Sequence, residues 1–242
     1  MIKIVSCFCN VEKYIKRCIS SITKQKFEDY EVYLIDDMSS DQTVNIINEL
    51  IGSNPKFKLI VNIEKKFKLK NMYDLISNRE YFDDEDTIVE LDGDDFLFNE
   101  NVLDKINSTY LEDTNIWLTN GSFIYSDGRN GFSSEVNPET VRTDNFNFSH
   151  LRTWKTHLWR KIKIEDFLDE NGEFFKSAPD VAYSYPMVEM AGKKHYKFIK
   201  DILYVYNEEN PYNEHKKMSQ GGFGSQVKNT FYIQSKPKYN SL

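Results

Sequence analysis

Three carboxylates occur within four residues in Asp92-Gly93-Asp94-Asp95. Like charges at this spacing repel one another, so the segment either stays solvated or gathers around a positive charge. A divalent cation resolves the repulsion, because hard cations take oxygen ligands. The preceding residues, Thr87 to Leu91, have the pattern of a buried strand, and Gly93 allows a tight turn at its end. The pattern favours a metal-binding turn, and an acidic surface turn is the alternative.

A second acidic group, Asp36-Asp37, follows another strand-like run, Glu31 to Ile35. A carboxylate at a strand end can accept hydrogen bonds from a ribose hydroxyl or a base N–H. The alternative is helix capping, in which Ser40 or Asp41 caps the next helix and Asp37 favours its positive end. These residues alone fit capping at least as well as binding.

The elements that must position both clusters alternate along the first half of the chain. The pattern predicts strands over residues 2–9, 31–35, 57–63 and 87–91, and helices over 11–24, 44–51 and 71–77. Alternation of this kind predicts an α/β fold with a mostly parallel sheet and helices on both faces. Ligands of such sheets bind beyond the carboxyl ends of the strands, where both acidic clusters fall.

The second half is less regular. We expect helices over 101–110, 156–162 and 181–191, the last kinked at Pro186, strands over 116–119, 123–125 and 151–154, a polar loop over 127–147 and a strand-rich segment over 196–206. We predict one domain over residues 1–206 and a C-terminal tail over 207–242. No internal repeat or linker divides the chain.

The composition excludes several classes of protein. The 242 residues are 40% hydrophobic and 29% charged, with a net charge of −7 and a pI near 5.3. An acidic chain has no overall attraction to nucleic acid or anionic lipid. No apolar run approaches the roughly 20 residues of a membrane span. Three cysteines near the N-terminus, Cys7, Cys9 and Cys18, look reduced, so we expect a cytoplasmic protein, soluble or peripheral.

Together these segments resemble the family 2 glycosyltransferases, which have the GT-A fold. The likeness lies in residues 4–10, 14–22 and 30–43, and in Leu91-Asp92-Gly93-Asp94-Asp95, which is similar to the DxD element of that family. Lys70-Asn71 is similar to the basic-Asn pair before it, although Lys and Phe replace the usual upstream glycine. The resemblance is strong over residues 2–125 and traceable to about 206. It implies a nucleotide-sugar half over 1–125 and an acceptor and catalytic half over 126–206.

The resemblance also implies donor-site roles. Asp37 would contact the nucleotide base beside Asp36, Asp92 would face the ribose or donor sugar, and Lys70 would approach the phosphates. Asp94 and Asp95 would hold Mn²⁺ or Mg²⁺ on the diphosphate. The full set of implied residues is Cys7, Cys9, Asp36, Asp37, Lys70, Asp92 and Asp94 for the donor and Asp94, Asp95 and His215 for the metal. Cys7 and Cys9 replace the family's usual residues, which leaves the base open, and a solvated tail is the alternative for His215.

In the second half, the resemblance implies that Asp180 is the catalytic base of an inverting transfer. The alternative is that Asp180 only caps a helix, since Pro179 replaces the usual acidic neighbour. Arg152, Trp154 and Lys155 fall where the family faces the acceptor. Trp154 could stack on a sugar and the two cations could meet a phosphate, while a strand with Trp154 in the core is the alternative.

The sequence therefore predicts a metal-dependent, inverting glycosyltransferase that uses a UDP-sugar and acts on a glycan, a lipid-linked or another hydroxyl acceptor. Three other classes remain. A nucleotidyltransferase usually needs a Gly-rich basic loop after the first strand, where this chain has Cys9 to Lys13. An aspartyl phosphatase needs Thr or Val where Phe96 stands. A nucleotide- or sugar-binding module with the same fold but no turnover also fits the departures noted above.

Overall fold

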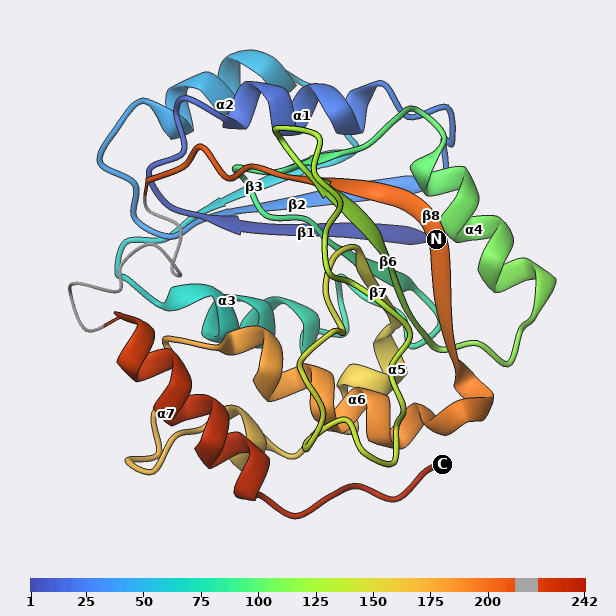
Figure 1. Ribbon diagram of the computed structural model, residues 1–242. Coiled ribbons are helices and arrows are strands. Elements are labelled where there is room, and N and C mark those ends of the chain that lie inside the picture. The colour runs from blue at the N-terminus through green and yellow to red at the C-terminus, as the bar shows by residue number, and fades with distance from the viewer. Residues whose placement is uncertain (212–221) are drawn as a thin grey trace.

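A single mixed sheet forms the centre of the computed structural model, which describes residues 1–211 and 222–242 (Figure 1). Its strand order is β3-β2-β1-β4-β7-β6-β8-β5. The strands are β1 (Ile2–Phe8), β2 (Tyr30–Asp36), β3 (Phe57–Val61), β4 (Thr87–Glu90), β5 (Phe96–Leu97), β6 (Leu118–Tyr125), β7 (Arg152–Lys155) and β8 (Tyr196–Tyr206). The helices are α1 (Ile15–Thr23), α2 (Thr43–Ile51), α3 (Phe67–Ile76), α4 (Val102–Glu112), α5 (Thr156–Trp159), α6 (Pro179–His195) and α7 (Gly222–Ser235), with a 3₁₀ turn over Ile164–Phe167.

The predicted alternation of strand and helix is confirmed in the first half. β1 pairs in parallel with β2 and with β4, and β2 pairs in parallel with β3. Because these strands are parallel and joined through helices, their carboxyl ends meet at one edge of the sheet. The turns after β2 and β4 therefore lie at the same edge, as the sequence predicts.

The second half reverses the direction of the sheet. β7 pairs antiparallel with both β4 and β6, and β8 runs parallel to β6 and antiparallel to β5. The antiparallel β7 enters the sheet at Arg152, so the start of β7 lies beside the end of β4. This reversal brings residues from the second half to the edge where the acidic turn lies.

Helices cover both faces of the sheet, which confirms the predicted layering (Figure 1). One apolar core joins α1, α2 and α4 to one face through residues such as Ile15, Ile47 and Leu103. The other joins α3, α5, α6 and α7 to the opposite face through residues such as Met72 and Ile233. Burial of these side chains supplies the main stabilisation of the fold.

Some local predictions need correction. The short helix expected from residue 71 begins at Phe67, and the two strands expected over 116–125 are one strand, β6. The non-helical backbone within α6 lies at Gly192, with φ 55°, and not at Pro186. Pro186 is tolerated inside α6, whereas a positive φ favours glycine.

The C-terminal residues pack against the domain. Ile233 of α7 is 1% exposed, and the buried Arg142 donates hydrogen bonds to the carbonyl oxygens of Ile233 and Lys236. The Leu242 N–H donates to the Met190 carbonyl of α6. Within the described residues, no helix is both long and apolar enough to cross a membrane.

Candidate active site

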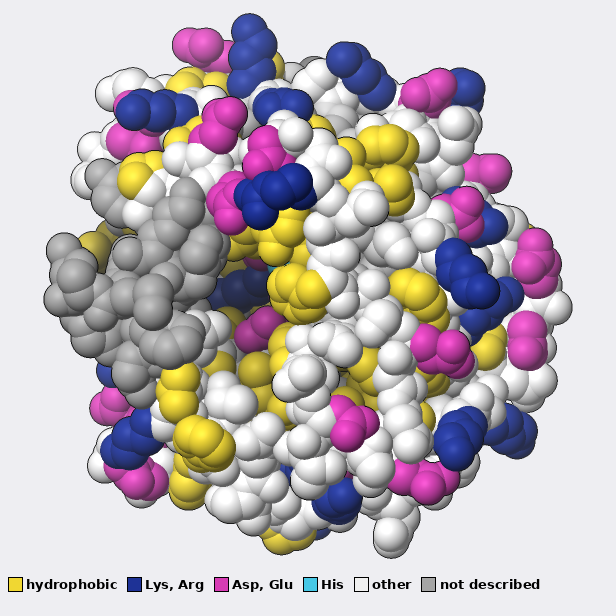
Figure 2. Space-filling view, in the orientation of Figure 1, with side chains coloured by type: hydrophobic (Ala, Val, Ile, Leu, Met, Phe, Trp, Pro, Cys, Tyr) yellow, Lys and Arg dark blue, Asp and Glu magenta, His cyan; other side chains and the backbone are white. Residues whose placement is uncertain are grey.

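A pocket of about 560 Å³ opens at the carboxyl ends of β1 and β4 and faces the N-terminus of α6. Figure 2 shows the hollow, with basic and acidic side chains inside it. Its lining draws on both halves of the chain. The polar and sulfur-bearing lining residues are Cys7, Cys9, Asn10, Lys65, Lys68, Asp92, Asp94, Asp95, His150, Arg152, Asp180, Tyr206, Asn210 and Gln226.

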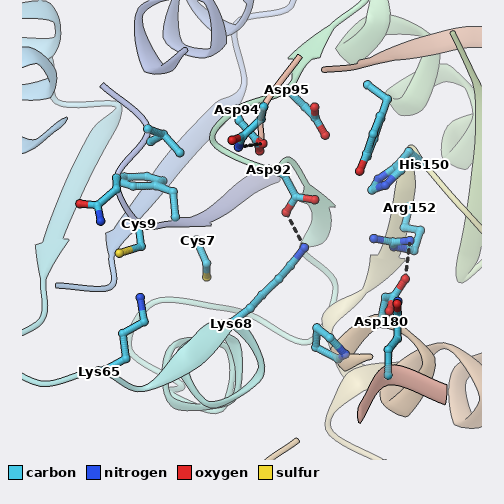
Figure 3. A pocket seen from close by; sticks show the side chains of 17 residues that line it. Cys7, Cys9, Lys65, Lys68, Asp92, Asp94, Asp95, His150, Arg152 and Asp180 are labelled. Atoms are coloured by element: carbon cyan, nitrogen blue, oxygen red, sulfur yellow. Dashed lines mark hydrogen bonds and ion pairs between the residues drawn. The ribbon is translucent and has the colours of Figure 1, made fainter. Parts of the chain in front are cut away.

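The acidic turn after β4 forms one wall of this pocket (Figure 3). Gly93 is required there, because a Cβ at this position would lie 2.7 Å from Cβ of Phe8. The turn can therefore pack directly against the end of β1. The Asp95 carboxylate accepts hydrogen bonds from the Tyr204 hydroxyl and the Asn207 N–H, both at 2.6 Å, and these bonds anchor the turn to β8 and the residues after it.

Among the described residues, the carboxylates of this wall carry more negative charge than the cations paired with them carry positive charge. Burial and the neighbouring Asp92 raise the pKa of Asp94. Burial, Asp94 and Asp92 raise the pKa of Asp95 well above its usual range. Lys68 forms an ion pair with Asp92, and Asn210 donates a hydrogen bond to Asp94 at 2.6 Å. Carboxylates whose pKa values are raised by one another are the setting that a bound cation stabilises.

A divalent cation fits this wall. One ligand atom from each of Asp92, Asp95 and His150 lies within 4.8 Å of the others. Burial and Arg152 lower the pKa of His150 well below its usual range, so its imidazole is neutral and can bind a metal. Asp94 adds a carboxylate that faces the pocket. A set dominated by carboxylates suits Mg²⁺ or Mn²⁺.

The predicted metal set therefore changes in part. Asp94 and Asp95 lie at the pocket as predicted, and His150 is a histidine that could join them at a metal ion. His215 lies outside the described residues. A lone histidine at the start of a predicted strand gives no sequence signal, because its partner Asp95 is 55 residues earlier in the chain.

A buried ion network lies beneath the wall of the pocket that is opposite the acidic turn. Glu90, 2% exposed, accepts hydrogen bonds from Arg152 Nε and from the Tyr183 hydroxyl, both at 2.6 Å, and lies 2.7 Å from Lys68 Nζ. Burial acts to raise the pKa of Glu90, but Arg152 and Lys68 hold it well below its usual range. Glu90 is thus a buried anion that holds Lys68 and Arg152 in place, and both of these cations line the pocket.

Asp180 stands above this network. It lies in the first turn of α6, directly after Pro179, and its Oδ2 is 3.7 Å from Arg152 Nη1 (Figure 3). Arg152 is 1% exposed, and its Nη1 has no hydrogen-bond partner among the described residues. The Asp180 carboxylate is half-buried and borders the pocket, opposite Asp94 and Asp95.

Asp36 and Asp37 are not in the lining of the pocket. Asp37 accepts hydrogen bonds from the backbone N–H groups of Lys66 and Phe67, at 2.8 and 3.0 Å, and so caps α3. Burial acts to raise the pKa of Asp37, but these bonds and one from Asn62 lower it. The cap of α2 is Asp41, which accepts from the Thr43 N–H. Asp37 therefore caps a helix, but a later one than the sequence suggested.

Three predicted contacts lie away from the pocket. Lys70 pairs with Asp74 on the outer side of α3, and Lys68 points into the pocket instead. Trp154 is 0% exposed and stacks on Trp159, so it is a core residue and has no free face for a sugar. The Lys155 ammonium donates to the Glu85 carbonyl. Of the predicted acceptor residues, Arg152 alone lies in the pocket lining.

Several site residues were not predicted from the sequence. Lys65, Lys68, Glu90 and His150 are the charged or titratable ones. Glu90 carried a usable signal, because a charged residue inside an otherwise apolar strand needs a buried partner. The roles of Cys7 and Cys9 as donor contacts, and of Asp180 as base, stay predictions, although all three border the pocket.

Known proteins are similar to this chain in sequence. Residues 3–163 match the model of the family described as glycosyl transferase family 2. The dTDP-rhamnosyl transferase RfbG of Shigella flexneri is 29% identical over 133 residues, which are 54% of this chain and 46% of that protein. The chondroitin synthase of Pasteurella multocida is 27% identical over 171 residues, which are 66% of this chain and 17% of that protein. The chain thus spans about half, or less, of these curated relatives.

Solved structures share the fold. TarS 1–349 of S. aureus has a TM-score of 0.68 at 18% identity, covering 96% of this chain and 64% of that one. The mannosyltransferase PcManGT of Pyrobaculum calidifontis, solved with GDP-Man and Mn²⁺, has a TM-score of 0.63 at 15% identity, covering 98% of this chain and 65% of that one. These likenesses show the GT-A type of fold. With two thirds of its length matched by the family model, this chain belongs to glycosyl transferase family 2.

Proposed function

We propose that the chain transfers a sugar, with inversion, from a nucleoside diphosphate sugar to an acceptor hydroxyl. One observation carries the proposal. The pocket places the carboxylates of Asp92, Asp94 and Asp95 on one wall and the carboxylate of Asp180 on the facing wall. A displacement reaction needs such an arrangement, because the leaving group and the incoming hydroxyl act on opposite sides of the anomeric carbon.

The acidic wall serves the leaving group. A divalent cation held by Asp92, Asp94, Asp95 and His150 would supply charge neutralisation to the departing diphosphate. Lys68, which borders the pocket beside Asp92, adds a positive charge from this chain. Preorganised positive charge of this kind lowers the barrier to transfer because it needs no rearrangement during the reaction.

Asp180 serves the acceptor. Its carboxylate takes the proton of the acceptor hydroxyl as that oxygen bonds to the anomeric carbon and the bond from that carbon to the diphosphate oxygen breaks. Arg152, held rigidly by Glu90, orients the Asp180 carboxylate from 3.7 Å. In this proposal, residues 1–125 bind the donor, and residues 126–206 bind the acceptor and supply the base.

UDP is the proposed nucleotide. Support comes from the neighbour TarS, solved in complex with UDP-GlcNAc and with UDP. The neighbour PcManGT was solved with GDP-Man, so the base is the part of the proposal that most needs a direct test. Cys7 and Cys9 lie where a bound nucleotide would meet the end of β1.

The test compares wild type with Asp180→Asn in the presence of Mn²⁺ and a panel of UDP-, GDP- and dTDP-sugars. Release of nucleoside diphosphate should fall by about 10²- to 10⁴-fold in Asp180→Asn, while nucleotide affinity stays unchanged. NMR of the sugar at the moment of release should show the inverted anomer. Unchanged turnover in the variant, or a retained anomer, would remove Asp180 as the base of a direct displacement. Nucleotide binding without turnover in wild type would favour a non-catalytic binding module.

A further inference from the structure

A second groove, of about 390 Å³, adjoins the pocket. The two share Asp180 and Gln226 in their linings, so one continuous surface runs past the Asp180 carboxylate. The groove lies between the loop that contains Phe146, the start of α6 and the face of α7. Its volume falls within the roughly 300–1,000 Å³ typical of ligand pockets.

The lining combines aromatic rings with side-chain amides. The accessible rings are those of Phe146 and Phe231, with Tyr185 fully buried behind them, and the amides are those of Asn145, Gln226 and Gln234. Phe146 packs edge-on against Tyr185 with ring centroids 5.9 Å apart, and Gln234 donates a hydrogen bond to the Tyr185 hydroxyl at 3.3 Å. Phe231 is 67% exposed, although it is a large apolar residue on a folded helix. Figure 2 shows hydrophobic side chains on the α7 side of the hollow.

This combination matches the chemistry of a sugar. A pyranose offers apolar C–H faces that stack on aromatic rings, and hydroxyls that both donate and accept hydrogen bonds. A side-chain amide is suited to hydroxyls because it carries both a donor and an acceptor. An apolar peptide or lipid would leave the amides without partners, which costs binding free energy.

The charged residues of the groove favour an uncharged sugar over an acidic one. Asp144 and Asp180 are the charged residues of its described lining, which includes no Lys, Arg or His. Arg142 lies 5.6 Å over the Tyr185 ring, but it is 3% exposed and its guanidinium donates to both carboxylate oxygens of Glu189. A uronic acid or a phosphate in the groove would face the carboxylates of Asp144 and Asp180, and the cation nearest to Asp180 is the buried Arg152, 3.7 Å away and already bonded to Glu90.

We propose that this groove is the acceptor subsite and that it binds an uncharged sugar chain. The chain lies across Phe231 and Phe146, whose rings are accessible, with its terminal hydroxyl at Asp180. This inference rests on the proposed function, because it uses Asp180 as the point where the acceptor reacts. It moves the acceptor contacts from Trp154 and Lys155 to a surface that includes α7.

In the experiment, the protein is loaded with UDP and Mn²⁺ and applied to a glycan array. The array carries neutral glycans and acidic glycans that contain uronic acid or phosphate. Wild type should bind neutral glycans. Phe231→Ala should weaken that binding about tenfold, since removing one stacking ring costs about 1–1.5 kcal/mol. Tyr232→Ala is the matched control, because Tyr232 lies next in α7 but borders a different surface pocket. It should bind as wild type does.

The outcomes separate the two proposals. Binding only to acidic glycans, binding that Phe231→Ala leaves unchanged, or no glycan binding by the nucleotide-loaded protein would each overturn the groove assignment. Nucleotide binding is measured on the same samples by melting temperature. If wild type shows no Mn²⁺-dependent nucleotide binding, the proposed function itself fails. If wild type, Phe231→Ala and Tyr232→Ala all bind nucleotide but the glycan pattern differs from the one expected, the assignment of the groove as acceptor subsite fails and the proposed function stands.

Discussion

The two walls of the pocket balance charge in different ways. The donor wall, defined as Asp92, Asp94, Asp95 and His150, carries carboxylates whose burial and mutual repulsion raise the pKa values of Asp94 and Asp95. The base wall, defined as Glu90, Arg152, Tyr183 and Asp180, is paired internally through bonds of 2.6 Å to Glu90. The donor wall therefore gains from an added cation, whereas the charges of the base wall are already paired at Glu90, and Asp180 is the carboxylate that this wall presents to the pocket.

Under the proposed function, this difference would let one small pocket treat the leaving diphosphate and the acceptor hydroxyl in opposite ways. The diphosphate needs positive charge as it leaves, and the acceptor hydroxyl needs a carboxylate that is free to take a proton. Lys68 joins the walls, since it pairs with Asp92 on one side and Glu90 on the other. The predictions below disturb one wall at a time.

The largest effect on stability is expected from Glu90→Gln. Removing the buried anion leaves Arg152 and Lys68 partly unpaired, which should lower the free energy of unfolding by about 3–5 kcal/mol. Urea unfolding at pH 7 measures the change. Glu85→Gln is the control, because the Glu85 side chain is 83% exposed, and it should unfold as wild type does. Equal stability of Glu90→Gln and wild type would contradict an internally paired base wall.

A smaller effect is expected on the donor wall from His150→Ala. Loss of a neutral imidazole ligand should weaken Mn²⁺ binding, measured by electron paramagnetic resonance in the presence of UDP, by about 10- to 100-fold. His157→Ala serves as the comparison, because His157 packs edge-on against Trp117 and does not line the pocket. The same Mn²⁺ affinity in both variants would exclude His150 from the metal site.

The smallest effect is expected at an ion pair outside both walls. Burial acts to raise the pKa of Glu31, but hydrogen bonds from Lys3, Lys58 and Tyr33 lower it to about 2. A lowered folded-state pKa stabilises the fold above the unfolded value, near 4.5, and that contribution is lost as the pH falls toward 2.

Glu31→Gln should therefore cost about 1–2 kcal/mol of unfolding free energy at pH 7. The cost should shrink as the pH is lowered from about 4.5, when urea unfolding of the two proteins is compared at each pH. A cost that stays constant down to pH 3 would show that the carboxylate charge of Glu31 does not stabilise the fold.

Much of the donor-side fold could be predicted from the sequence, because its elements have local patterns. β1 to β4 and the helices between them follow hydrophobic periodicity, and the acidic turn follows β4 directly. The acceptor side depends on contacts that are distant in sequence. The residues of β4 and β7 that pair in antiparallel register lie 64 to 68 positions apart in the chain. α7 has a polar pattern, and Ile233 is the one buried side chain among those that the structure describes in this helix.

The site does not follow this division, because predicted residues from both halves border the pocket and others from both halves do not. Asp92, Asp94, Asp95, Arg152 and Asp180 border the pocket, as their predicted roles require. Lys70, expected near the phosphates, lies outside the pocket lining, whereas Lys68 lies in it, because residues two apart on a helix point to nearly opposite sides. Trp154 failed because it lies two residues further along β7 than Arg152, inside the core. No local pattern distinguishes such neighbours before the packing is known.

The central claim is that the two walls have separate roles, and melting temperature tests it most directly. Wild type, Asp94→Asn and Asp180→Asn are each heated with UDP, with and without Mn²⁺, and with GDP, CDP and ATP for comparison. A ligand at about 100 times its Kd adds roughly 2.7 kcal/mol, or a few degrees. We predict a Mn²⁺-dependent rise with UDP in wild type and Asp180→Asn, and none in Asp94→Asn. No rise in wild type with any nucleotide, or a full rise in Asp94→Asn, would contradict the account.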